Sequence, residues 1–169
     1  MRLLHWLLVL SVAAAWLTTM GALRWHEPAG YVAAGVVLAR LAWGWAGRGH
    51  ARFADFVRGP RATLHYLRSV LARREPRYVG HNPLGGWMVV ALLACVAALG
   101  LSGWLYTGTD LFWGEAWLEQ LHAALGWLLL ALIALHLSGV ALASLRHREN
   151  LVRAMVDGTK AAPGPGDVP

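Results

Sequence analysis

Two histidines, His122 and His136, lie fourteen residues apart in a segment that is otherwise almost entirely apolar. Each residue of an α-helix turns by about 100°, so fourteen steps bring the second side chain to within about 40° of the first. The helical rise of about 1.5 Å per residue separates the two imidazoles by about 21 Å along the axis. Because an ionisable side chain inside a membrane is costly and marks a functional site, the spacing predicts one binding histidine near each membrane surface.

The elements that position these histidines are predicted to be membrane helices. The chain is 57% hydrophobic and 14% charged, a composition typical of membrane proteins. Stretches long and apolar enough to span a bilayer are Leu3 to Leu23, Tyr31 to Ala46 with its flanking residues, Leu84 to Tyr106 and Trp117 to Leu145. The start of the first stretch also fits an export signal, but its length and His5 favour a retained helix. We therefore expect an all-α fold, an integral membrane four-helix bundle.

The basic residues predict how this bundle lies in the membrane. The segment between the second and third stretches holds eight arginines, and the tail beyond the fourth holds four more basic residues. The connection between the third and fourth stretches holds only acidic charges, Asp110, Glu115 and Glu119. By the positive-inside rule, both termini and the middle segment are cytoplasmic. This topology explains the net charge of +6, so nucleic acid is not expected as a partner.

The middle segment and the C-terminal tail carry separate predictions. Residues from Pro60 to Arg74 fit an amphipathic helix on the cytoplasmic surface, where membrane lipid would attract its arginines. Asn82 and Pro83 fit the cap and first turn of the third membrane helix. The Gly- and Pro-rich residues 158–169 are expected to be disordered, which leaves residues 1–157 as one membrane domain.

Four histidines form pairs at two depths under this topology. His5 begins the first helix inside, and His136 lies in the inner half of the fourth. His26 begins the second helix outside, near the depth of His122. Two bis-histidine sites stacked in a helix bundle are suited to two b-type haems. The sequence has no Cys-x-x-Cys-His, so the haems would be held without covalent attachment.

Several further residues keep two interpretations each. Arg40, near the inner end of the second helix, is either an interfacial arginine or the partner of a haem propionate. His81 is either an interfacial polar residue or a hydrogen-bond donor to a quinone or a propionate. Gly30 and Gly126 each follow a histidine by four residues, where they either leave room for a flat macrocycle or pack helices.

These residues together resemble the bacterial cytochrome b561 family, which includes the b-type cytochrome subunit of nickel-iron hydrogenases. The resemblance rests on Arg2-Leu-Leu-His5-Trp6, His26 with Gly30-Tyr31, Arg40 with Trp43-Gly44, His50-Ala-Arg-Phe53-Ala-Asp-Phe56, Gly80-His-Asn-Pro-Leu-Gly85, Leu121-His122, Leu135-His136 and His147-Arg-Glu-Asn150. It covers nearly the whole chain and implies four core helices. It also implies two non-covalent haems b with ligands at His5, His26, His122 and His136.

The expected function is transmembrane electron transfer. Electrons would pass between the quinone pool and a periplasmic redox partner, either a c-type cytochrome or an oxidoreductase subunit. The protein would then be a multi-pass protein of the bacterial inner membrane, possessing two haems b and binding quinone as substrate or cofactor.

Two alternatives remain open from the sequence. In the first alternative, the protein acts on its own as a superoxide:quinone oxidoreductase. An exposed haem edge surrounded by basic residues would favour this activity. Arg24 is the one basic residue of the outer connections, which otherwise hold acidic groups, so this alternative ranks lower. The other alternative is a haem-free membrane anchor or a metal-ion path that uses the same histidines.

Overall fold

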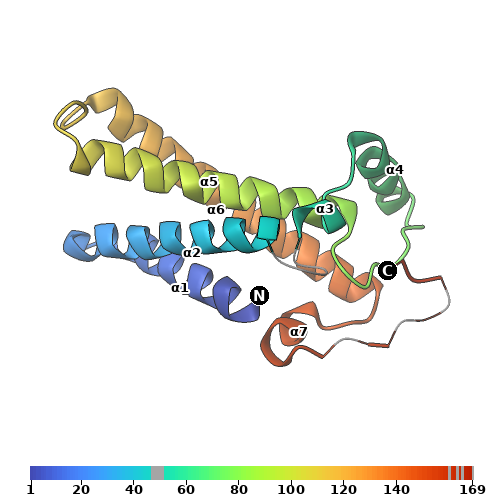
Figure 1. Ribbon diagram of the computed structural model, residues 1–169. Coiled ribbons are helices and arrows are strands. Elements are labelled where there is room, and N and C mark those ends of the chain that lie inside the picture. Colours follow the sequence, from blue (N-terminus) through green and yellow to red (C-terminus); the bar gives the residue numbers. More distant parts are fainter. Residues whose placement is uncertain (47–51, 160, 163, 165, 169) are drawn as a thin grey trace. The chain divides into compact units, whose positions relative to one another are not determined.

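The computed structural model describes residues 1–46, 52–159, 161–162, 164 and 166–168 (Figure 1). These residues form the helices α1 (Arg2–Thr18), η1 (Leu23–Trp25, a 3-10 turn), α2 (His26–Ala46), α3 (Phe53–Phe56), α4 (Pro60–Leu71), α5 (Pro83–Gly108), α6 (Ala116–Arg146) and α7 (Leu151–Asp157). No strand occurs in the part of the chain described, so the predicted all-α class is confirmed there.

Three of the described helical segments are long and apolar enough to cross a membrane. They are Leu23–Ala46, Pro83–Gly108 and Ala116–Arg146, with 24, 26 and 31 residues. Helix α1 is apolar but has only 17 residues, so it is shorter than the predicted first stretch. Helix α2 starts at His26, as predicted, and with η1 it reaches a spanning length.

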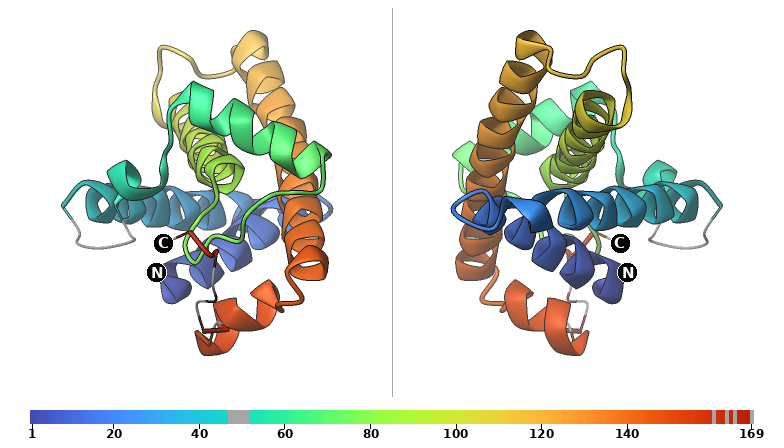
Figure 2. Two further views of the ribbon diagram at one scale, coloured as in Figure 1. Left: turned by 90° about the vertical axis from the view of Figure 1, so that its right-hand side faces the viewer. Right: turned by 90° about the vertical axis from the view of Figure 1, so that its left-hand side faces the viewer.

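The chain divides into two compact units. The first comprises Met1–Ala42 and Ala91–Ile133, and it contains α1, most of α2, the C-terminal part of α5 and the N-terminal part of α6. Its helices α1 and α2 lie side by side (Figures 1 and 2). Trp16 of α1 packs edge-on against Trp127 of α6, with ring centroids 5.4 Å apart. On α5, a Cβ at Gly100 would lie 3.0 Å from the Ala34 side chain of α2, so a small residue is needed for this close approach.

The second unit comprises Trp43–Val90 and Ala134–Pro169. Helix α4 is the amphipathic helix of the predicted segment, and it ends at Leu71, two residues before Arg73 with its φ of 55°. Helix α5 begins as predicted, because the Asn82 side chain accepts a hydrogen bond from the backbone N–H of Gly85 at 2.7 Å.

The C-terminal residues of the second unit contact the segment that leads into α5. The Val168 backbone N–H donates to the carbonyl of Arg77 at 2.8 Å, and the Val79 N–H donates to the carbonyl of Val168 at 2.9 Å. The Arg77 guanidinium forms ion pairs with Glu149 and Asp167. These carboxylates raise the pKa of Arg77 although its partial burial opposes this, so the guanidinium remains charged.

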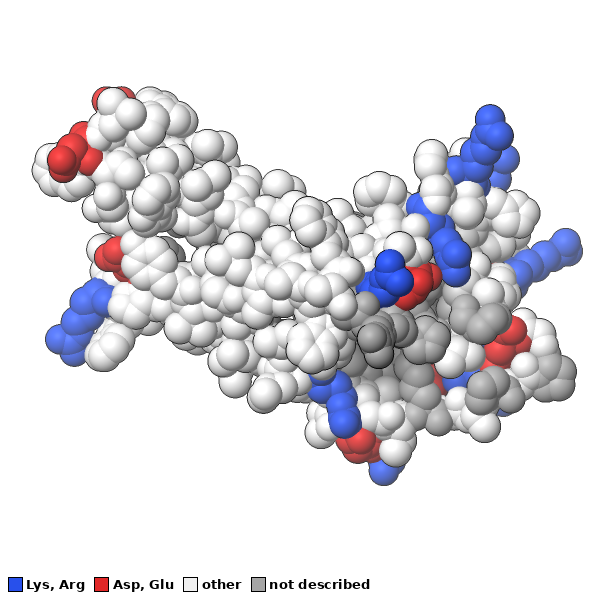
Figure 3. All heavy atoms as spheres, viewed as in Figure 1, with Lys and Arg blue, Asp and Glu red and all other residues white. Residues whose placement is uncertain are grey.

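Charged residues follow the ends and connections of the helices. Figure 3 shows uncharged surface along the helix bodies of the first unit, and acidic residues at the end where α5 connects to α6. Within the second unit, Figure 3 shows basic residues around α4. The pattern is the one expected when apolar helix bodies face hydrocarbon and charged connections face water.

Candidate functional site

His26 is the first residue of α2 and directly follows the turn η1. Its Nδ1 lies 2.8 Å from the carbonyl oxygen of Ala15 on α1. A carbonyl only accepts, so Nδ1 carries the proton and donates this hydrogen bond. In the neutral imidazole Nε2 then has a free lone pair, which is the form that binds a metal.

His122 on α6 is held in the same way by a side chain of α5. Its Nδ1 lies 2.9 Å from the hydroxyl oxygen of Ser102, which is buried. The Ser102 hydroxyl donates its own proton to the carbonyl of Leu99 at 3.1 Å, so it accepts from Nδ1–H of His122. The arrangement leaves Nε2 of His122 free, as for His26.

The two imidazoles lie next to each other in the first unit. Their ring centroids are 5.9 Å apart, and the ring planes are inclined by 75°. Metal–imidazole bonds are about 2.0 Å long, so two imidazoles on opposite sides of one metal ion have ring centres about 6 Å apart. The spacing is therefore the one expected if both histidines held the same ion.

Three glycines near His26 and His122 show how much space a flat macrocycle would have beside these histidines. At Gly30, one turn after His26, a Cβ would meet nothing within 4 Å, so the predicted space is open. At Gly126 the space is filled by the Trp16 ring, 3.1 Å from the Cβ position. A Cβ at Gly103 would lie 3.3 Å from Cε1 of His122. Any larger residue at Gly103 would therefore displace this ring.

A bare metal ion and a haem need different numbers of protein ligands. A structural zinc site needs four protein ligands, and a catalytic one usually three. Within the described ranges, no group of three or more His, Cys, Asp or Glu side chains is placed to hold a metal ion. A porphyrin brings four nitrogens of its own and needs only axial ligands from the protein. The pair His26 and His122 therefore fits the axial requirement of a haem.

The other predicted site residues are spread over both units. His5 lies half-buried on α1 in the first unit, with its ring centroid 5.5 Å from that of Trp6. His136 lies half-buried on α6 in the second unit, so the pairing of His5 with His136 stays a prediction. Arg40 is partly buried on α2, and His81 is exposed beside the ring of Phe56, 4.9 Å between centroids. His50, part of the family pattern, lies outside the described residues.

The hydrogen-bond partners of the two histidines, the Ala15 carbonyl and Ser102, are not among the site residues predicted from the sequence. Every backbone carbonyl looks alike in a sequence, so nothing marks Ala15. Ser102 did leave a signal, because it is a hydroxyl in an apolar span between Gly100 and Gly103, where helices approach closely. Its histidine partner follows only from the packing of α5 against α6.

The described residues define a class: an all-α protein with three helical segments long and apolar enough to cross a membrane, and with two neighbouring histidines at one end of them. The model of the prokaryotic cytochrome b561 family matches residues 1–158, and the chain belongs to this family. No curated protein and no solved structure shows a significant match to the chain. Family membership makes the chain a membrane-bound cytochrome that transfers electrons by means of b-type haem.

Proposed function

We propose that the chain carries electrons across the bacterial inner membrane through two non-covalent haems b. His26 and His122 would hold one haem near the outer surface, and His5 and His136 would hold the other near the cytoplasmic surface. The observation that carries the proposal is the outer pair, whose rings lie 5.9 Å apart with both Nδ1 atoms engaged. The bound haem would supply a one-electron Fe(II)/Fe(III) couple.

The histidine pair restricts the chemistry available at the iron. When imidazoles fill both axial positions, small molecules such as oxygen have no open coordination site, which favours electron transfer. The Ala15 carbonyl and the Ser102 hydroxyl each hold one imidazole in the tautomer that binds metal through Nε2. Arg40 would balance the charge of a haem propionate, and His81 would donate a hydrogen bond to a quinone or a propionate.

The proposed path connects the quinone pool with a periplasmic partner, a c-type cytochrome or an oxidoreductase subunit. Both termini and α4 would be cytoplasmic, which places the acidic α5–α6 connection outside. The positive-inside distribution of arginine supports this orientation.

The test is a haem count on detergent-purified protein. A dithionite-reduced minus oxidised spectrum and a pyridine haemochrome assay are expected to give two low-spin haems b per chain, both reducible by a soluble quinol. One haem per chain would refute the two-site proposal. A high-spin spectrum would refute bis-histidine ligation, and haems that quinol leaves oxidised would refute the quinone connection.

Removing the Ser102 hydroxyl is expected to change the potential of one haem while leaving its ligands in place. In Ser102→Ala, Nδ1–H of His122 loses the hydroxyl that accepts from it, so the imidazole would donate less charge to a bound haem iron, which would favour the Fe(II) state. Redox titration should show one of the two potentials rise by roughly 30 mV, which is about half of the 59 mV that corresponds to a tenfold change in a one-electron equilibrium constant.

Ser11 offers the matched control for this variant. It is also a buried membrane-helix serine that donates to a carbonyl three residues earlier, Leu8 at 3.0 Å. Ser11→Ala should leave both potentials unchanged. Equal shifts in the two variants would mean that the effect is general to helix packing and that Ser102 does not position His122.

A further inference from the structure

One exposed face of α4 consists of leucines. Leu64, Leu67 and Leu71 fall at a helical spacing that puts them on one face, with 48%, 38% and 76% of their surface exposed. On another face of the same helix Tyr66 is buried, which shows which side packs against the protein. Helix α4 has only 12 residues and cannot span a bilayer, so its apolar face must meet something other than the interior of a transmembrane bundle.

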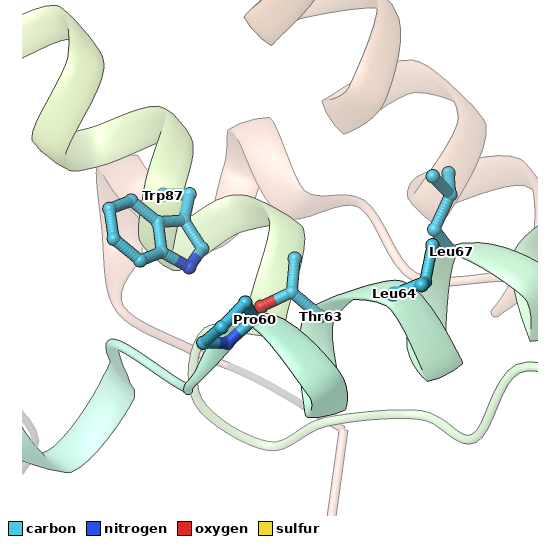
Figure 4. A pocket seen from close by; sticks show the side chains of 5 residues that line it. All are labelled: Pro60, Thr63, Leu64, Leu67 and Trp87. Carbon is cyan, nitrogen blue, oxygen red and sulfur yellow. The ribbon is translucent and has the colours of Figure 1, made fainter.

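A hollow of about 340 Å³ extends this face to the start of α5 (Figure 4). Its lining is Pro60, Thr63, Leu64 and Leu67 of α4 together with Trp87 of α5. The indole Nε1 of Trp87 donates to the carbonyl of Arg58 at 3.0 Å, which satisfies the polar atom of this ring. What remains in the hollow is almost wholly hydrocarbon surface, open to the outside and suited to an aliphatic chain.

Two arginines border the same face. Arg61 precedes Leu64 by three residues, and Arg68 follows Leu64 by four and precedes Leu71 by three, so both are immediate neighbours of the leucines. Both are exposed, and the helix contains no acidic residue. A hydrophobic face with a basic edge is complementary to a molecule that has an aliphatic chain and an anionic head.

We propose that this groove binds an anionic phospholipid, with an acyl chain along the Leu64, Leu67 and Trp87 surface and the phosphate at Arg61 and Arg68. The inference does not depend on the haem assignment, because no residue of the groove is a proposed haem ligand, although the groove shares the second unit with His136. It assigns α4 the role of a specific lipid site rather than a general basic surface.

The experiment compares phosphatidylglycerol with phosphatidylcholine, each titrated into the detergent-purified full-length cytochrome and followed by native mass spectrometry. Phosphatidylglycerol is expected to bind more tightly. The double variant Arg61→Gln/Arg68→Gln should weaken phosphatidylglycerol binding by about 25-fold, since each arginine near an anionic surface contributes a factor of roughly five.

The double variant Arg73→Gln/Arg74→Gln is the matched control. It removes the same charge from exposed residues beyond the end of α4 and should leave binding nearly unchanged. Leu67→Asn keeps every charge but interrupts the groove, and it should weaken phosphatidylglycerol binding severalfold. Haem content and far-UV circular dichroism check that each variant is folded.

Three outcomes would overturn the proposal. Equal affinity for the two lipids would show that the headgroup charge is not recognised. Equal losses in the two double variants would mean that only net charge matters, and unaltered binding by Leu67→Asn would mean that the groove takes no acyl chain.

Discussion

The variant His122→Leu is expected to retain one haem b per chain instead of two. His122 would supply one of the two axial ligands of the outer site, and its partner His26 lies 5.9 Å away between ring centroids. A haem without covalent attachment is held by its two iron–histidine bonds and by packing, so loss of one bond releases it during purification. The pyridine haemochrome assay measures the result directly.

Double variants test which histidines share a haem. His26→Leu/His122→Leu should also keep one haem, because both changes remove the same site. His122→Leu/His136→Leu should keep none, because the proposed pairing puts these residues in different sites. His65→Leu is the control, since His65 is exposed on α4 and should leave both haems bound. If His26→Leu/His122→Leu lost both haems while circular dichroism showed a folded protein, the pairing would be wrong.

The helices were predictable because local chemistry sets their ends. Pro60 fixes the start of α4, and Asn82 with Pro83 fixes the start of α5, in agreement with the sequence-based bounds. One predicted end was less accurate. Hydropathy extends the first stretch to Leu23, but α1 ends at Thr18 because the chain must turn through η1 before His26. The start of α2 at His26 agrees with the prediction, in which Pro28 occupies the first turn ahead of the apolar stretch from Tyr31.

The site was predictable only in its most regular part. Charge-based topology puts His26 and His122 at similar depth, and the structure brings these two rings together. Their hydrogen-bond partners depend on how α1 meets α2 and how α5 meets α6, which is tertiary packing that no local pattern encodes. The ion pairs of Arg77 and Arg146 with residues more than 70 positions away are equally invisible in sequence.

The ion pair between Arg146 and Glu75 is expected to contribute most of the pH-dependent stability of the second unit. Arg146, at the end of α6, donates to the Glu75 carboxylate and to the carbonyl of Val70. The Glu75 side chain is only 6% exposed, and its buried Oε2 atom has no hydrogen-bond partner among the residues that the structure describes. Burial by itself would raise the pKa of Glu75, but the hydrogen bond from Arg146 and the nearby positive charges lower it below its ordinary value.

Arg146→Gln should therefore lower the free energy of unfolding by about 2 kcal/mol at pH 7, below the range for fully buried pairs because Arg146 is 26% exposed. The direction of the pH dependence should also reverse. In the wild type, the Glu75 contribution is complete above its unfolded pKa and is lost as the pH falls through the lowered folded pKa. In the variant, burial without a cation raises that pKa, so acidification from pH 7 should relieve the unpaired charge and stabilise the fold.

Thermal unfolding in detergent between pH 4 and 8 measures both effects. The double variant Arg146→Gln/Glu75→Gln should recover most of the lost stability, because it removes the buried charge together with its partner. Arg153→Gln is the control, since Arg153 pairs with Asp157 while 76% exposed and should leave the midpoint unchanged. If Arg146→Gln unfolded at the wild-type temperature, the ion pair would not contribute to stability. If Glu75→Gln failed to rescue Arg146→Gln, the loss would come from the missing hydrogen bond between Arg146 and the Val70 carbonyl instead of from the buried charge.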